Sequence, residues 1–247
     1  MKEALLILMN RIKDELVFPT PMERCNITSI YKQGMKSVFD NFRGVFRVNI
    51  LRNILDRLLF NDVYPMIDSN LTDANVGSRN VRNIRDNLFV LNAITNSVAK
   101  GDERPCDVQA YDVEKCYDAL WAQECINDFY DNGCVNDKLA LMHLENQNAQ
   151  VAIKTSKGIT ERINIQNIIM QGTVMAGLFC TATTDKLAKI VYENKKLLYL
   201  YKGKVQVPPL MMVDDIITIS ECSSTSIAMN ATVNKFAESK KLKLKLS

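Results

Sequence analysis

Two adjacent aspartates interrupt an otherwise apolar stretch near the end of the chain. Asp214 and Asp215 lie between LMMV at 210–213 and IITI at 216–219. Carboxylates seldom occur within an apolar run unless they are paired or bind a metal ion, because burying a bare charge is costly. The alternative interpretation is an exposed hairpin turn, where acidic residues are common. In both cases the segment predicts two short strands that meet at the aspartates.

A third aspartate is a candidate partner for this pair. Asp112 ends a strand-like segment, CDVQAYDV at 106–113, and a predicted helix follows it at 114–130. Converging carboxylates of this kind can hold two divalent ions, which about 3.5–4 Å apart clamp the oxygens of a phosphoryl displacement. Mg²⁺ needs only a few protein carboxylates when substrate phosphates complete its shell. Asp118 competes for the role, but its position within the helix favours a solvated or hydrogen-bonded side chain.

The charges are unevenly distributed, although the formal net charge is only +3. Residues 24–85 hold ten Lys or Arg against five Asp or Glu, and residues 101–150 hold three against eleven. From residue 231 onward there are five Lys and one Glu. Two basic regions flanking an acidic one predict contact with polyanions at two places. The alternative is that most of these charges are solvated helix faces.

Composition excludes several classes of protein. An apolar content of 47% with 24% charged residues does not fit collagen, a disordered tail or a coiled coil. No window approaches ~18 consecutive apolar residues, so we expect no membrane span, and we interpret the N-terminus as an amphipathic helix. Seven cysteines without a CxxC pair, and His143 as the one histidine, argue against zinc. We expect reduced thiols and an intracellular location, with nucleus and cytoplasm not distinguished.

Periodicity predicts a mixture of helices and strands without a regular βαβ repeat, which is typical of the α+β class. Helices are expected at 4–16, 45–59, 82–99, 114–130, 174–193 and 225–239. Strands are expected at 26–32, 106–113, 150–154, 160–165, 210–219 (two short ones) and 241–247, with a hairpin at 197–207.

Several segments, in order, resemble the motifs of reverse transcriptases, and those of non-LTR (LINE-like) retrotransposons most closely. YDVEKCYDAL at 111–120, MQGTV at 170–174 and MVDD at 212–215 resemble motifs A, B and C. Upstream, ITSIYKQG at 27–34, NFRGV at 41–45 and DANVGSRNVRNIRDNL at 73–88 resemble fingers segments, and KKLKLKLS at the end resembles the start of motif D. The resemblance covers nearly the whole chain.

The resemblance implies a right-hand polymerase with fingers at 1–105 and a palm at 106–247, in which an antiparallel sheet is backed by helices. Some fingers residues are expected between motifs A and B. The implied activity is RNA-directed DNA synthesis from an RNA template, a DNA primer and dNTPs, with two Mg²⁺ ions as cofactor and Mn²⁺ as a substitute. The sequence given stops at Ser247, so we expect a fingers–palm fragment without a thumb.

The resemblance also assigns the acidic centre. Asp112 and Asp214 match the principal metal carboxylates, and Asp215 completes the acidic cluster. Val113 matches a residue that offers a backbone carbonyl oxygen to the metal. These three aspartates are the predicted catalytic residues.

Substrate contacts follow from the same match. Tyr117 matches the aromatic residue that crowds a ribose 2′-hydroxyl, and Gln171 and Gly172 match motif B. Lys32 and Arg43 match fingers residues that neutralise the triphosphate, for which the Arg fork is suited. The alternatives are a core aromatic for Tyr117, a helix-entry glycine for Gly172, and solvated charges for the two cations.

Three further cations are candidates for the template path, where they would bind phosphates: Arg79, Arg82 and Arg85. Two other functions remain open. One is a catalytically silent remnant that only binds nucleic acid, and the other is a viral RNA-dependent RNA polymerase, against which Tyr117 argues. The oligomeric state cannot be predicted.

Overall fold

The computed structural model describes residues 2–135, 137–166 and 169–246, so Ser247, the last residue of the predicted C-terminal strand, lies outside it. The chain forms two compact units, each made of two separate stretches. The first unit is Met1–Ile67 with Trp121–Phe179, and the second is Asp68–Leu120 with Cys180–Ser247. Residues 68–105 lie in the unit that holds the three aspartates, and residues 121–179, which include the stretch between motifs A and B, lie in the other.

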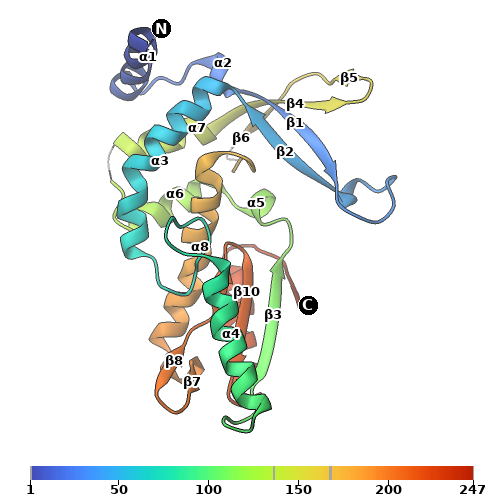
Figure 1. The fold of residues 1–247 in the computed structure, drawn as a ribbon. Coiled ribbons are helices and arrows are strands. Elements are labelled where there is room, and N and C mark those ends of the chain that lie inside the picture. Colours follow the sequence, from blue (N-terminus) through green and yellow to red (C-terminus); the bar gives the residue numbers. More distant parts are fainter. Residues whose placement is uncertain (1, 136, 167–168, 247) are drawn as a thin grey trace. The chain divides into compact units, whose positions relative to one another are not determined.

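A five-stranded mixed sheet forms the centre of the first unit (Figure 1). Strand β1 (Arg24–Tyr31) pairs antiparallel with β2 (Phe42–Val48) and parallel with β4 (Asn148–Thr155), and β4 also pairs with β5 (Gly158–Ile159) and β6 (Ile163–Gln166). The remaining elements of the unit are α1 (Lys2–Glu15), α2 (Thr20–Glu23), η1 (Phe39–Asn41), α3 (Ile50–Asn70, up to Ile67), α6 (Ala122–Asp131), α7 (Asp137–Gln147) and the start of α8 (Val174–Glu193).

One face of this sheet is apolar, because alternate residues of a strand point the same way. Cys25, Phe46 and Val151 come from three neighbouring strands and form a buried cluster with Ala149 and Met170. The opposite face carries exposed cations at the intervening positions, which are Arg24, Arg43, Arg47 and Lys154. The sheet therefore has one packed side and one basic side.

Three charged side chains are buried together in the first unit. Arg52 of α3 is 1% exposed and donates through Nη2 to the carbonyl oxygen of Glu145, 2.5 Å away, while its guanidinium lies 5.3 Å from the Phe18 ring centroid. Asp56 and Glu145 hydrogen-bond to each other. Burial raises the pKa of both carboxyls, and the neighbouring Asp56 raises the pKa of Glu145 further, well above its ordinary value.

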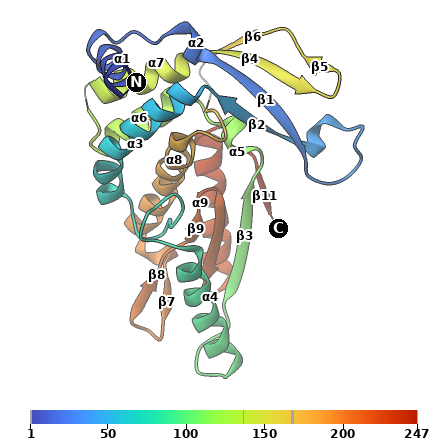
Figure 2. The ribbon, with the colours of Figure 1, turned by 45° about the horizontal axis from the view of Figure 1, so that its top comes forward.

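A four-stranded antiparallel sheet with the order β11-β3-β10-β9 forms the centre of the second unit. Its strands are β11 (Leu244–Leu246), β3 (Asp107–Val113), β10 (Asp215–Ser220) and β9 (Leu210–Met212), and Figure 2 shows β11 beside β3. The other elements are α4 (Ile84–Ala99), α5 (Cys116–Ala119), the rest of α8, η2 (Lys195–Leu197), β7 (Tyr199–Tyr201), β8 (Val205–Val207) and α9 (Ser223–Ser239). Helix α9 packs against β10 and β3, and α4 contacts β9.

The core of the second unit lies where α4 meets the strands. Ile94 of α4 packs with Leu210 of β9 and Ile219 of β10, and Tyr199 and Val207 of the β7–β8 hairpin complete the cluster. Partly buried Val90, Leu91, Cys106, Tyr201 and Ile217 surround it. The α+β class and the helix-backed antiparallel sheet predicted from sequence are thus confirmed. In the part of the chain that the model describes, no helix combines the length and apolar character needed to span a bilayer.

Two predicted helices are wrong in extent. The helix expected at 45–59 begins at Ile50, because Val45–Val48 pair with β1 as the end of β2, and it runs on to Asn70. The helix expected at 114–130 is broken into α5 and α6, since Leu120 is extended (φ −74°, ψ 135°) and Lys115 is left-handed (φ 51°). Helix α7 was not predicted.

Candidate active site

The antiparallel register brings Asp112 and Asp215 to the same end and the same face of the sheet. Tyr111 of β3 pairs with Ile216 of β10, so Asp112 and Asp215 occupy the next opposed positions. Directly opposed residues of an antiparallel pair have neighbouring side chains. Both residues are exposed. Partial desolvation and, after it, the charge of Asp112 raise the pKa of the Asp215 carboxyl, and the second of these is the repulsion expected between two neighbouring carboxylates.

Asp214 belongs to the tight turn between β9 and β10. Met212 pairs with Asp215, which leaves Val213 and Asp214 as the two loop residues. Val213 has a φ of 59°, in the left-handed region, while Asp214 does not. A positive φ at the first loop residue alone is the pattern of a type II′ turn, whose first loop position favours glycine. The predicted acidic turn is therefore present, but it consists of Val213 and Asp214, and Asp215 is already in the strand.

The protein side chains at this site can supply only some of the ligands that an Mg²⁺ ion needs. Across residues 2–135, 137–166 and 169–246, no three His, Cys, Asp or Glu side chains are grouped closely enough to hold a metal ion by themselves. Mg²⁺ commonly takes one or two protein carboxylates and completes its shell with water and substrate phosphates. The repelling pair Asp112 and Asp215 provides that number of carboxylates, and a cation between them would relieve their repulsion.

Other residues of the motif A segment lie at the end of β3 and just after it. Val113 is buried and pairs with Leu244 of β11, and Tyr117 lies half-buried in α5. Asp118 is exposed, and its backbone N–H donates to the carbonyl of Lys115 (2.9 Å), in agreement with the solvated position expected for it. The roles of Val113 as metal ligand and Tyr117 as sugar-crowding residue stay predictions.

The predicted triphosphate and motif B residues all lie in the first unit. Lys32 follows β1 and Arg43 lies on β2, both exposed. The carbonyl of Gln171 accepts a hydrogen bond from the N–H of Phe46 in β2 (3.0 Å). Gly172 has a φ of 110°, and a Cβ placed on it would lie 3.1 Å from the carbonyl oxygen of Phe46. Glycine is required here by backbone geometry and by the approach of β2.

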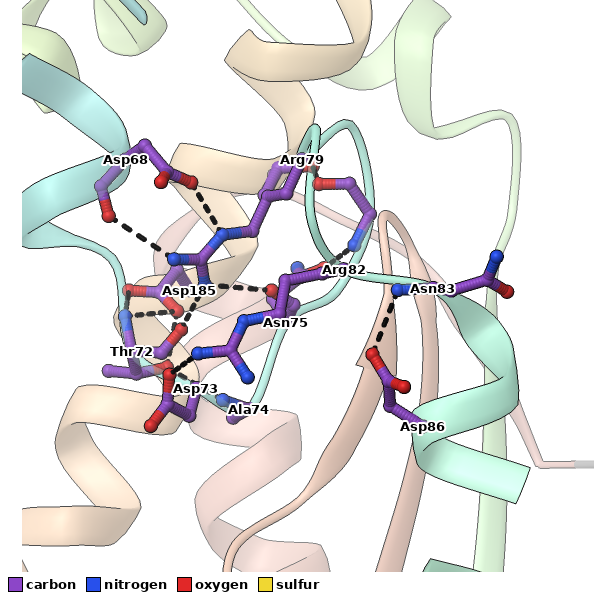
Figure 3. A network of polar contacts seen from close by, with 12 residues as sticks. Asp68, Thr72, Asp73, Ala74, Asn75, Arg79, Arg82, Asn83, Asp86 and Asp185 are labelled. Carbon is purple, nitrogen blue, oxygen red and sulfur yellow. Dashed lines mark hydrogen bonds and ion pairs between the residues drawn. The ribbon is translucent and has the colours of Figure 1, made fainter. Parts of the chain in front are cut away.

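The three arginines predicted for the template path differ in their surroundings, and Figure 3 shows two of them, Arg79 and Arg82. Arg79 has a 6% exposed side chain, and it donates to Asp68 Oδ1 (2.6 Å) and to the carbonyls of Thr72 (2.5 Å) and Asn75 (3.2 Å). Arg82 pairs with Asp73, and Arg85 is exposed at the start of α4. These contacts favour a structural role for Arg79, whereas Arg82 and Arg85 are both exposed.

Arg79 is part of a larger polar network that pins residues 72–79 (Figure 3). Asp185 of α8 is fully buried and accepts from the backbone N–H (3.1 Å) and the hydroxyl (2.5 Å) of Thr72. Burial raises the pKa of Asp185, and the bonds from Thr72 oppose this. Asn75 at the centre of the segment is also fully buried. Neither Asn75 nor Asp185 carries a signal in the apolar periodicity, so sequence reasoning missed both.

Comparison with solved structures shows a reverse transcriptase-like fold. Three telomerase structures are similar to this chain: apo telomerase from Candida tropicalis (TM-score 0.63, 14% identity), the same enzyme truncated from its C-terminal domain (0.58, 14%), and telomerase from Candida albicans in complex with the TWJ fragment of telomeric RNA (0.61, 11%). The alignments cover 96%, 100% and 93% of this chain, respectively. No protein-family model matches the sequence.

The similarity extends over only part of each telomerase. This chain spans 48%, 55% and 43% of the three telomerase chains, about half their length. At these identities the comparison establishes the architecture of fingers and palm.

Proposed function

We propose that this chain is the polymerase part of an RNA-directed DNA polymerase of the non-LTR retrotransposon type. The observation that carries the proposal is the placement of Asp112 and Asp215 at opposed positions of β3 and β10, beside the turn that holds Asp214. The reverse transcriptase-like fold supports the polymerase class. The retrotransposon type rests on the resemblance of the ordered sequence segments.

In the proposed reaction, a primer 3′-hydroxyl attacks the α-phosphorus of a dNTP and pyrophosphate leaves. Asp112 and Asp215, with Asp214 in the adjacent turn, would hold Mg²⁺ together with water and substrate phosphates. The metal would supply electrostatic stabilisation of the charge that develops on the phosphoryl oxygens. The carboxylates position the metal ions and form no covalent bond with the substrate. Tyr117 would exclude ribonucleotides, and Lys32 and Arg43 would neutralise the triphosphate.

RNA is the proposed template, and the basic face of the first-unit sheet is a proposed contact for it. Arg24, Arg47 and Lys154 are exposed on that face, beside Arg43, which is assigned to the triphosphate. If these three side chains contact three phosphates, they would contribute a slope of about −2 to a plot of log affinity for single-stranded RNA against log salt concentration. Two of the structural neighbours are telomerases solved with a fragment of telomeric RNA.

The test is Mg²⁺-dependent incorporation of dNTPs onto a labelled DNA primer annealed to an RNA template. We expect Asp112→Asn and Asp214→Asn each to lower the rate by at least about 100-fold, since charge stabilisation of the transition state is lost. Asp118→Asn is the matched control, because it removes an exposed carboxylate from the same segment and should leave the rate unchanged.

An unchanged rate in Asp214→Asn would overturn the proposed site. RNA binding without incorporation in the wild-type chain would favour the silent, binding-only alternative. Preference for rNTPs over dNTPs would favour the RNA-dependent RNA polymerase alternative, and Tyr117→Ala tests this directly, because it should admit rNTPs if the ring excludes them.

A further inference from the structure

The turn that carries Asp214 has a conformation that its own sequence disfavours. Val213 is left-handed, with a φ of 59°. A β-branched residue at positive φ is a true outlier, because its Cβ crowds the following peptide. Such conformations persist only when surrounding structure holds them, and they are concentrated at functional sites. The conformation of Val213 therefore requires groups from elsewhere in the chain to hold it.

The side-chain amide of Asn75 contacts both polar groups of the Val213 backbone. Asn75 Oδ1 accepts from the Val213 N–H (3.1 Å), and Asn75 Nδ2 donates to the Val213 carbonyl (3.2 Å). The same amide accepts from the N–H of Gly77 (3.0 Å) and donates to Thr184 Oγ1 (3.0 Å). Four partners fix the orientation of the amide, because reversing it would place its NH₂ against two N–H donors.

Thr184 adds a second contact to the same carbonyl. Its hydroxyl, fully buried in α8, lies 2.7 Å from the oxygen of Val213. Gly77 completes the enclosure, since a Cβ placed on it would lie 2.3 Å from the Val213 nitrogen. Side chains and backbone from two other segments therefore surround this one residue.

Asn75 is itself held in place. The backbone carbonyl of Asn75 accepts a hydrogen bond from Arg79. The residues on either side of Asn75 pair with Met211: the Val76 N–H donates to the Met211 carbonyl (3.0 Å), and the Met211 N–H donates to the Ala74 carbonyl (3.0 Å). Figure 3 shows how Arg79, with Thr72 and Asp185, fastens this segment around Asn75. A rigidly anchored amide can impose a conformation, whereas a mobile one could not.

We propose that Asn75 is a positioning residue for the catalytic turn, with Thr184 as its auxiliary. By holding Val213 left-handed, it fixes the direction in which Asp214 and Asp215 leave the turn. The proposal rests on the proposed function, in which these carboxylates act on nucleotides. It assigns Asn75 no contact with substrate.

The main variants are Asn75→Ala and the similarly sized Asn75→Asp, which replaces the donor to the Val213 carbonyl with an oxygen. We expect each to lower kcat by about 100-fold, the cost of displacing a catalytic group by about 1 Å. The KM for primer–template should stay unchanged, and the Mg²⁺ concentration for half-maximal rate should rise. Independently of activity, hydrogen exchange at the Val213 amide should become faster in Asn75→Ala, because its acceptor is lost, and should change less in Asn75→Asp, which keeps an acceptor oxygen.

Rescue separates positioning from general loss of stability. Glycine adopts the left-handed region without steric cost. Adding Val213→Gly to Asn75→Ala should therefore recover at least about tenfold of the lost kcat, since the turn then needs less support. Thr184→Val should lower kcat, whereas Thr184→Ser, which keeps the hydroxyl, should not. If Asn75→Ala does not fold, the comparison of Thr184→Val with Thr184→Ser tests the proposal.

Asn87→Ala is the matched control. Asn87 of α4 also donates its side-chain amide to a backbone carbonyl of this hairpin, that of Met211 (2.9 Å), but it does not contact the turn. It should leave kcat and the Mg²⁺ dependence unchanged. Equal effects of Asn75→Ala and Asn87→Ala, or no rescue by Val213→Gly, would overturn the proposal. If Asp214→Asn were fully active, the proposed function would fail instead, so the two failures are distinguishable.

Discussion

Replacement of Arg79 by alanine should destabilise the protein and leave its affinity for RNA almost unchanged. The guanidinium makes four hydrogen bonds to Asp68, Thr72 and Asn75, and its side chain is 6% exposed. At a net 0.5–1.5 kcal/mol per bond, their loss costs about 2–6 kcal/mol. Asp68 keeps 25% exposure and can hydrate once released, so the lower half applies and we expect about 3 kcal/mol.

The assay is thermal unfolding followed by circular dichroism, together with fluorescence anisotropy of a labelled single-stranded RNA at several salt concentrations. A loss of about 3 kcal/mol should lower the melting temperature of a chain of this size by about 6–12 °C. Arg85→Ala is the matched control, because Arg85 is exposed: we expect an unchanged melting temperature and weaker, less salt-dependent RNA binding. If Arg79→Ala melted like the wild type and bound RNA more weakly, the structural role would be refuted and the template-path prediction upheld.

Three further predictions concern other parts of the chain. Hydrogen bonds from Ser224 and Thr225 lower the pKa of the exposed Cys222 thiol to about 7, so iodoacetamide at pH 8 should label Cys222 before the other six cysteines. The labelling rate, followed by mass spectrometry, should rise through a midpoint near pH 7, and earlier labelling of Cys106 would contradict the prediction. Burial raises the pKa of Glu145, so the folded state keeps this carboxyl protonated above its unfolded pKa, and stability falls as pH rises from about 4.5 toward the raised value. In melting curves between pH 5 and 8.5, Glu145→Gln should make stability less dependent on pH, and a steeper loss of stability at high pH in this variant would contradict the prediction. Gly172→Ala should lower the free energy of unfolding by roughly 1–3 kcal/mol, because alanine is strained at a φ of 110° and its Cβ would contact the Phe46 carbonyl oxygen. Urea unfolding measures this, and an unchanged free energy of unfolding would mean that the turn readjusts.

Local sequence patterns predicted most of the elements around the candidate site. The strand expected at 106–113 is β3, the helix expected at 174–193 is α8, and the hairpin expected at 197–207 is β7–β8. These segments have strong periodicity or clear turn residues, such as Lys202-Gly203. The break between α5 and α6 could not be predicted, because apolar residues continue at helical spacing through it and neither Gly nor Pro marks it.

Long-range contacts account for what sequence reasoning missed. The parallel pairing of β1 with β4 joins Arg24 to Gln150, and the contact of Asn75 with Val213 joins residues 138 apart. Nothing in MVDD indicates a left-handed valine, since valine disfavours that region and the groups that contact its backbone, Asn75 and Thr184, lie far away in the sequence. Likewise, the sequence does not indicate that the carbonyls of residues 72 and 75 accept hydrogen bonds from Arg79.

The division of each unit into two stretches affects how the protein emerges from the ribosome. Strand β1 is made early, but its parallel partner β4 follows 126 residues later at the Arg24–Gln150 pair. At 5–20 residues per second, one edge of the β1–β2 hairpin waits for roughly 6–25 s without that partner. The second unit likewise needs β10, which is synthesised long after β3. Neither unit is a contiguous excerpt, so shortened chains that end before β4 would expose an unpaired strand edge and be prone to aggregate.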